Sequence, residues 1–145
     1  ENHGLTDWLR WEEDERAKHK YLPLCPDFLS GSGPNGGATD SFASDTARMA
    51  ISQLEAKQIT TDLKDLVKYA RGLSATEQKV RVIGFCWGSA QTFRYATHDD
   101  SLAVAFYGWP SETSAMPRIN CPICGFYGQN DQRKLTPRLE PCKRR

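Results

Sequence analysis

A cysteine between two glycines is the residue of this chain with the clearest capacity for chemistry. Gly84, Cys86 and Gly88 lie where an apolar run over residues 80–85 ends and a helical pattern over 88–97 begins. This is the G-x-nucleophile-x-G arrangement of a nucleophile elbow, with a thiol at its apex. Such a turn brings backbone against backbone and leaves no space for a Cβ at either glycine. The sequence therefore predicts a strand, a sharp turn and a helix that present Cys86.

The position of Cys86 at the start of a helix also bears on its reactivity. The positive end of a helix dipole favours the thiolate, which is the nucleophilic form of cysteine. The competing interpretation is a buried cysteine on a glycine-flanked turn. The strand before the turn and the helix after it favour the elbow, because they are the context that the motif requires.

Alternating elements must position this cysteine. Apolar runs predict strands over 80–85, 102–107 and 122–127, with a helix over 88–97 between the first two. Alternation of strands and helices predicts an α/β fold with a mainly parallel sheet flanked by helices. Ligands bind such sheets beyond the carboxyl ends of the strands. Cys86 follows the first predicted strand and Asp131 the last, so both are expected at the same edge.

The sequence of the first half of the chain predicts three helices and one strand. The helices are expected over 6–20, 44–54 and 59–73, the last with Ile59, Leu63 and Val67 on one face and Gly72 at its end. Residues 21–28 are short and apolar and are predicted as a strand, although they contain two prolines. Residues 30–41 are rich in glycine and lack the order of a phosphate-binding loop, which indicates a linker or a lid.

Composition limits the classes of protein that fit. The chain has 145 residues with 39% apolar side chains, enough for one ordinary core, so a single domain over 1–145 is expected. A net charge of +1 gives no electrostatic case for nucleic acid, and neither a membrane-spanning run nor a signal peptide is visible. Five irregularly spaced cysteines argue against a complete disulfide framework and slightly favour a cytoplasmic location.

The order of several short motifs resembles one enzyme family. The chain is similar over most of its length to the dienelactone hydrolases, cysteine-dependent members of the α/β-hydrolase fold. The resemblance rests on Glu-Asn-His-Gly-Leu at 1–5, Pro-Asp-Phe-Leu-Ser-Gly at 26–31, Gly-Pro-Asn-Gly-Gly at 33–37, Val-Ile-Gly-Phe-Cys-Trp-Gly at 82–88, Phe-Tyr-Gly at 106–108, and Gly-Phe-Tyr-Gly-Gln-Asn-Asp at 125–131.

The resemblance implies a role for five residues. Cys86 matches the nucleophile, Asp131 the carboxylate that orients the catalytic histidine, and Glu1 the glutamate that contacts the resting thiol. The backbone N–H groups of Asn2 and Trp87 match the oxyanion hole. The implied activity is hydrolysis of a lactone or activated carboxylic ester of the dienelactone type through an acyl-enzyme. The implied partner is a small-molecule substrate, with no metal or organic cofactor, and the oligomeric state is left open.

The chain departs from the family at both ends. The family's histidine follows the aspartate, whereas fourteen residues follow Asp131 and none is histidine. Of the three histidines present, His3 is the one worth testing as a substitute base, because bases are recognised by geometry rather than chain order. The chain is therefore expected to be a fragment truncated at both ends, with weak or no activity. A central strand preceding Glu1 is expected to be missing, which would leave the predicted strands over 21–28 and 80–85 separated or rearranged.

Two other classes of function stay open at this point. The chain could be a non-catalytic domain that binds a small molecule in the elbow pocket. Alternatively, Cys121 and Cys124 could form a redox pair or, with Cys25 and Cys142, part of a zinc site. A redox C-x-x-C normally opens a helix, whereas this one enters an apolar strand, so ordinary strand cysteines are favoured.

Overall fold

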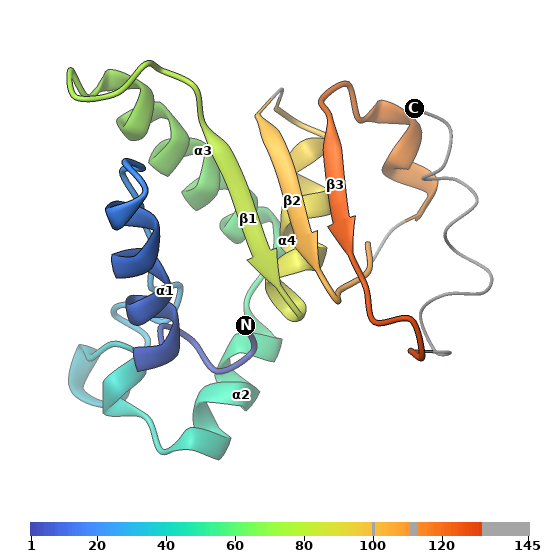
Figure 1. Cartoon of the computed structure of the whole chain (residues 1–145). Coiled ribbons are helices and arrows are strands. Elements are labelled where there is room, and N and C mark those ends of the chain that lie inside the picture. The colour runs from blue at the N-terminus through green and yellow to red at the C-terminus, as the bar shows by residue number, and fades with distance from the viewer. Residues whose placement is uncertain (100, 111–112, 132–145) are drawn as a thin grey trace. The chain divides into compact units, whose positions relative to one another are not determined.

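The chain divides into two units, residues 1–78 and 79–145. Their structure is a computed structural model that describes residues 1–99, 101–110 and 113–131. Figure 1 shows helices throughout the first unit and a small sheet in the second.

The first unit contains three α-helices and two short 3₁₀ turns. The helices are α1 (Asp7–Lys18), α2 (Ser44–Gln53) and α3 (Ala56–Gly72), and the turns span Pro34–Gly36 and Thr39–Ser41. Helix α3 buries Ile59, Leu63 and Val67, as their four-residue spacing predicts, and ends at Gly72. The three predicted helices are confirmed to within a few residues at their ends.

Helix α1 has no buried residue. Trp11 is 54% exposed and Trp8 is also exposed. Glu12 and Arg16, one turn apart, form an ion pair on the same face. Helix α1 is therefore mostly exposed and has a weak apolar face.

The strand predicted over 21–28 is wrong. Residues 21–27 adopt no regular secondary structure, and Phe28 begins a turn. Pro23 and Pro26 lack the backbone N–H that a strand donates to its neighbour, and a short apolar run forms a strand only where a partner strand accepts it. The segment is instead fixed by side chains: the Asp27 carboxylate accepts hydrogen bonds from the Leu29 N–H at 2.9 Å and the Thr39 N–H at 2.9 Å.

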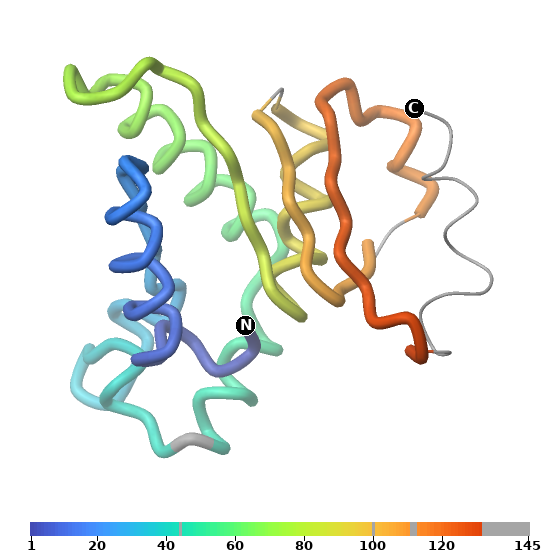
Figure 2. Tube along the Cα trace, viewed as in Figure 1, coloured from blue at the N-terminus to red at the C-terminus, as the bar shows by residue number. Residues whose placement is uncertain are grey.

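The second unit contains a three-stranded parallel sheet. Its strands β1 (Arg81–Phe85), β2 (Leu102–Phe106) and β3 (Ile123–Phe126) lie in the order β1-β2-β3. Helix α4 (Trp87–Ala96) packs on β1 and β2, and a 3₁₀ helix (Thr113–Arg118) lies between β2 and β3. Figure 2 follows the chain from β1 back along the sheet through α4. The predicted α/β fold with a parallel sheet is confirmed.

The two faces of this sheet differ in their side chains. One face forms an apolar core with α4 and the 3₁₀ helix, built from Phe93, Ala96, Ala103, Ala105, Ile119 and Cys121. The register pairs Phe85 with Phe106 and Phe106 with Phe126, so three phenylalanines form a row across the strands. The rings of this phenylalanine row stack with centroids 4.9 and 4.7 Å apart. Because side chains alternate along a strand, the row lies on the opposite face from Ala105.

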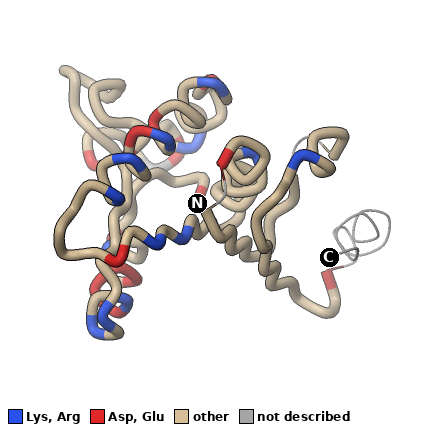
Figure 3. Tube along the Cα trace, turned by 90° about the horizontal axis from the view of Figure 1, so that it is seen from above, with Lys and Arg blue, Asp and Glu red and all other residues tan. Residues whose placement is uncertain are grey.

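Within the described residues, charged side chains differ in frequency between the helices and the strands. Acidic and basic residues interleave along the helices, and the strands carry almost no charge (Figure 3). Arg81, the first residue of β1, is exposed, which avoids the cost of burying its charge. Among the residues described, none of the helices is both long enough and apolar enough to cross a membrane.

Candidate functional site

Cys86 lies between the last residue of β1 and the first residue of α4. Its backbone has φ 53° and ψ −114°, a conformation that is costly for a residue with a Cβ. Such strain persists only where the surrounding structure holds the residue in place, and it is common at active sites. The local geometry is that of a nucleophile elbow with a half-buried thiol.

Gly84 is required by the close approach of the strand and the helix. A Cβ at this position would lie 2.3 Å from the carbonyl oxygen of Gly88 and 2.4 Å from Oγ1 of Thr92. Both contacts are far shorter than side-chain atoms tolerate. The first glycine of the motif therefore has the steric role that its spacing predicts.

Backbone hydrogen bonds attach the elbow to β2. The Cys86 N–H donates to the Phe106 carbonyl at 3.0 Å, and the Ser89 N–H donates to the Cys86 carbonyl at 3.1 Å. Gly108 closes this side, because a Cβ there would lie 2.1 Å from the Cys86 carbonyl oxygen. The strained residue is thus held by β2 and by the segment that follows it.

An aromatic pair lies next to this segment. The indole ring of Trp109 stacks on the ring of Tyr127 with centroids 5.1 Å apart. The Tyr127 hydroxyl donates to the Gly108 carbonyl at 3.1 Å. Since Gly108 packs against Cys86, the pair is connected to the elbow through one residue.

Asp131 lies beyond the carboxyl end of β3. It ends a turn in which its N–H donates to the Gly128 carbonyl at 3.1 Å. Because β1, β2 and β3 are parallel, Cys86 and Asp131 both follow strands that end at the same edge of the sheet. This is the arrangement expected for a nucleophile and an acid of one site, although the role of Asp131 itself stays a prediction.

Glu1 and Asn2 begin the first unit, in a loop whose anchor is Thr39. The Leu5 N–H donates to Oγ1 of Thr39 at 3.0 Å, and Thr39 Oγ1 in turn donates to the Asp27 carboxylate at 2.7 Å. The loop is therefore attached to the segment over which the strand prediction failed. The roles of Glu1 and Asn2 stay predictions, as does that of the Trp87 N–H at the first position of α4.

The histidine of the second unit is far from the thiol. His98 follows α4 at its carboxyl-terminal end, whereas Cys86 caps the amino-terminal end. Twelve residues at a helical rise of 1.5 Å each separate them by about 18 Å. His3 and His19 belong to the first unit.

Cys121 and Cys124 have different surroundings. Cys121 is buried in the core beneath α4, where Ile123 also packs, whereas Cys124 is exposed. Alternation along β3 directs Cys124 to the face opposite that of Ile123. Within the described part of the chain, no group of three or more His, Cys, Asp and Glu side chains could hold a metal ion. Cys142 lies outside the described residues, so its part in the zinc hypothesis is not tested.

Cys25 is a thiol with strongly altered acidity. Burial, together with the charge of the Glu13 carboxylate, which accepts a hydrogen bond from the thiol, raises the pKa of Cys25 to about 12. Burial likewise raises the pKa of Glu13. A thiol that stays protonated is a poor nucleophile, so Cys25 is unsuited to covalent catalysis.

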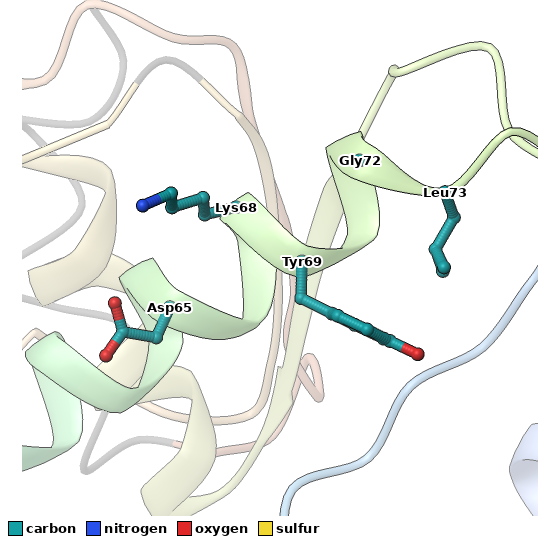
Figure 4. A pocket seen from close by; sticks show the side chains of 5 residues that line it. All are labelled: Asp65, Lys68, Tyr69, Gly72 and Leu73. Atoms are coloured by element: carbon teal, nitrogen blue, oxygen red, sulfur yellow. The ribbon is translucent and has the colours of Figure 1, made fainter.

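One shallow hollow lies on the exposed side of α3, lined by Asp65, Lys68, Tyr69, Gly72 and Leu73 (Figure 4). Tyr69 and Leu73 point the same way from the end of the helix, and Lys68 points away from them. Because all five residues come from one helix and its cap, the hollow does not bring together groups from different elements.

The sequence did not predict the part played by Ser89. Its side chain is 0% exposed and connects α4 to both β1 and β2. The only signal was a serine three residues after the nucleophile in an otherwise apolar surrounding, which does not reveal a contact with β2, seventeen residues away.

Comparison with known proteins identifies the family. The sequence model of the "Dienelactone hydrolase family" matches residues 2–140. A "Putative carboxymethylenebutenolidase" of Methylorubrum extorquens is 30% identical over 129 residues, which cover 80% of this chain and 44% of that protein. The protein of the same name in Escherichia coli K12 is 28% identical over 143 residues, 88% of this chain and 51% of its own length.

A mouse "Carboxymethylenebutenolidase homolog" is 24% identical over 124 residues, 84% of this chain and 49% of its own length. The chain thus spans about half the length of the curated relatives it matches. The family match extends over nearly the whole sequence and includes the elbow and the strands that position it. The chain therefore belongs to the dienelactone hydrolase family.

Proposed function

We propose that the protein hydrolyses a lactone or an activated carboxylic ester of the dienelactone type, with Cys86 as the nucleophile. The observation that supports this most strongly is the strained backbone of Cys86 at a strand-to-helix turn where Gly84 has no room for a Cβ. A structural cysteine has no need of such a conformation. The family assignment supports the class of reaction.

In the proposed reaction the Cys86 thiolate attacks the carbonyl carbon of the substrate. A C–S bond forms while the carbonyl electron pair moves to oxygen, giving a tetrahedral oxyanion. When the carbonyl re-forms, the C–O bond of the ester or lactone breaks and the leaving oxygen takes up a proton. Water then attacks the thioester, and the carboxylic acid is released together with the regenerated thiol.

The remaining roles follow from the resemblance, and the position of Trp87 supports its role. Trp87 is the first residue of α4, and the N–H groups in the first turn of a helix favour an anion, which suits the oxyanion. We assign the Asn2 N–H as the second donor, Glu1 as the contact of the resting thiol, and Asp131 as the carboxylate that orients a catalytic base. Loss of one oxyanion donor typically slows such reactions by about 10²–10³-fold.

We further propose that these 145 residues acylate faster than they deacylate. The chain has three histidines, and none follows Asp131. Hydrolysis of the thioester needs a base to activate water, whereas attack by a thiolate on an activated ester needs none. The acyl-enzyme should therefore accumulate.

The test is to incubate the chain with p-nitrophenyl acetate, record nitrophenolate release and map the acetyl group by mass spectrometry. We expect a burst close to one equivalent and an acetyl group on Cys86. Cys86→Ala should abolish both, whereas Cys124→Ser, which removes the exposed thiol of β3, should leave the burst intact.

Two results would contradict the proposal. Equal labelling of Cys86 and Cys124 would mean that the elbow gives no special reactivity. Saturable binding of the ester without any adduct would instead favour a non-catalytic binding domain.

A further inference from the structure

Ser89 makes contacts that a serine within a helix does not normally make. Its Oγ lies 2.8 Å from the carbonyl oxygen of Gly84 and 2.7 Å from that of Phe106. Serine in a helix usually donates to the carbonyl three or four residues earlier. Gly84 precedes Ser89 by five residues and belongs to β1, and Phe106 belongs to β2. The single hydroxyl proton of Ser89 is therefore shared between the ends of two strands.

The Phe106 carbonyl also binds Cys86, the proposed nucleophile. The Phe106 oxygen accepts the Cys86 N–H at 3.0 Å as well as the Ser89 hydroxyl, and the Ser89 N–H donates to the Cys86 carbonyl. Two hydrogen bonds to the Phe106 carbonyl thus hold Cys86 in place. One comes from its own N–H, and the other comes from the hydroxyl of Ser89, whose N–H binds the Cys86 carbonyl. Removing the Ser89 hydroxyl would release one of them.

Gly108 packs closely against Ser89 and Cys86. A Cβ at Gly108 would lie 2.5 Å from the Ser89 Cβ and 2.1 Å from the Cys86 carbonyl oxygen. Ser89 itself is completely buried. Alanine at 89 would lack the hydroxyl and would leave the Gly84 and Phe106 carbonyls with one donor fewer.

We infer that Ser89 is a positioning residue for the elbow: its hydroxyl fixes the ends of β1 and β2 against α4 and so fixes the Cys86 sulfur relative to the Trp87 N–H. The assignment to catalysis rests on the proposed function of Cys86. Ser89 does not touch the substrate. Since a misplacement of about 1 Å can cost about 10²-fold in rate, the loss of this attachment should slow acylation more than it slows any reaction that needs only an accessible thiolate.

The test compares Ser89→Ala with Ser101→Ala. Ser101 is also a buried serine of the second unit, 4% exposed. It directly precedes the first residue of β2, at the end of that strand away from Phe106, and its hydroxyl donates to Asp99. Three quantities are measured for each variant: the acylation rate of Cys86 with p-nitrophenyl acetate, its alkylation rate with iodoacetamide, and the amide hydrogen exchange of Cys86 by NMR. The urea midpoint of each variant reports its stability.

We expect Ser89→Ala to slow acylation by about 10- to 100-fold, to change alkylation by less than about threefold, and to speed exchange of the Cys86 amide. Ser101→Ala should lower the urea midpoint without changing these three quantities. The inference is overturned if exchange at Cys86 is unchanged in Ser89→Ala, or if Ser101→Ala has the same effects. If the unsubstituted chain forms no adduct at Cys86, the proposed function fails, while amide exchange still decides the positioning role.

Discussion

At the scale of single residues, two cysteines of the chain, Cys86 and Cys25, lie in contrasting environments. Cys86 is attached by its backbone to a strained turn and keeps a half-buried side chain. Cys25 donates to the Glu13 carboxylate, and burial together with that negative charge raises its pKa to about 12. Residue type alone therefore does not identify the nucleophile. The backbone conformation and the neighbouring charge are what favour Cys86 over Cys25 as the proposed nucleophile.

The environment of Cys25 leads to a prediction about its alkylation. Glu13→Gln removes the negative charge and the acceptor that raise the pKa of Cys25, so the thiol should ionise at lower pH. We expect faster labelling of Cys25 by iodoacetamide between pH 9 and 11, measured by peptide mapping. Glu15→Gln, which removes a carboxylate of the same helix paired with Lys18, is the control and should not change labelling. Equal labelling in all three proteins would mean that burial alone sets the acidity of Cys25.

The same shift affects stability at high pH. The pKa of Cys25 is raised from an ordinary 9.0 to about 12, so the folded state holds the proton more tightly than the unfolded state does. This contribution to the free energy of unfolding is complete below pH 9 and is lost as pH rises toward 12. Cys25→Ala should therefore show a smaller fall in its urea midpoint across that interval than the unsubstituted chain.

Gly84 gives a prediction about stability. In Gly84→Ala the new methyl group would meet the Gly88 carbonyl oxygen at 2.3 Å, so β1 and α4 would have to separate. We expect the free energy of unfolding to fall by about 1–3 kcal/mol, measured by urea denaturation. Gly72→Ala is the control, because its Cβ would meet nothing within 4 Å and alanine restricts the unfolded chain. A Gly84→Ala protein as stable as Gly72→Ala would contradict the close approach of strand and helix.

At the scale of elements, local sequence patterns predicted those features of the fold that depend on contacts between residues close in the sequence. The buried face of α3 follows from Ile59, Leu63 and Val67 alone, because their spacing brings them onto one side. The elbow follows from two glycines that the turn requires. The strand prediction over residues 21–28 failed because strand formation depends on a neighbouring strand. Hydrogen bonds between Asp27 and Thr39 fix this segment instead. The contacts of Ser89 with Phe106 and of Glu13 with Cys25 join distant positions, so no local pattern could have predicted them.

The phenylalanine row gives a prediction for the sheet. Phe106 stacks on Phe85 and on Phe126, whereas Phe126 stacks on Phe106 and is 49% exposed. An aromatic pair contributes about 0.5–1.5 kcal/mol beyond the area it buries. Phe106→Ala should therefore lower the free energy of unfolding by about 1 kcal/mol more than Phe126→Ala does. Equal losses in urea denaturation would mean that stacking across the strands adds nothing to burial.

At the scale of the whole molecule, the chain spans about half the length of its curated relatives, and its residues form two units. The expectation of one domain over 1–145 stays a prediction. The second unit by itself contains the elbow, the Trp87 N–H and Asp131, which we propose as the nucleophile, one oxyanion donor and the carboxylate that orients a base. Its one histidine, His98, lies at the far end of α4 from the thiol. Attack and deacylation are therefore expected to respond differently to an added base.

This difference can be measured by chemical rescue. General base catalysis contributes about 10²–10⁴-fold, so an acetyl group on Cys86 should be hydrolysed slowly by the chain alone and faster when imidazole is supplied. We expect imidazole to raise the steady-state release of nitrophenolate without changing the burst amplitude. Acetylated glutathione under the same conditions corrects for direct attack of imidazole on a thioester. Rapid turnover without imidazole would mean that the chain supplies its own base, and comparison of His3→Gln with His98→Gln would then show whether His3 is that base.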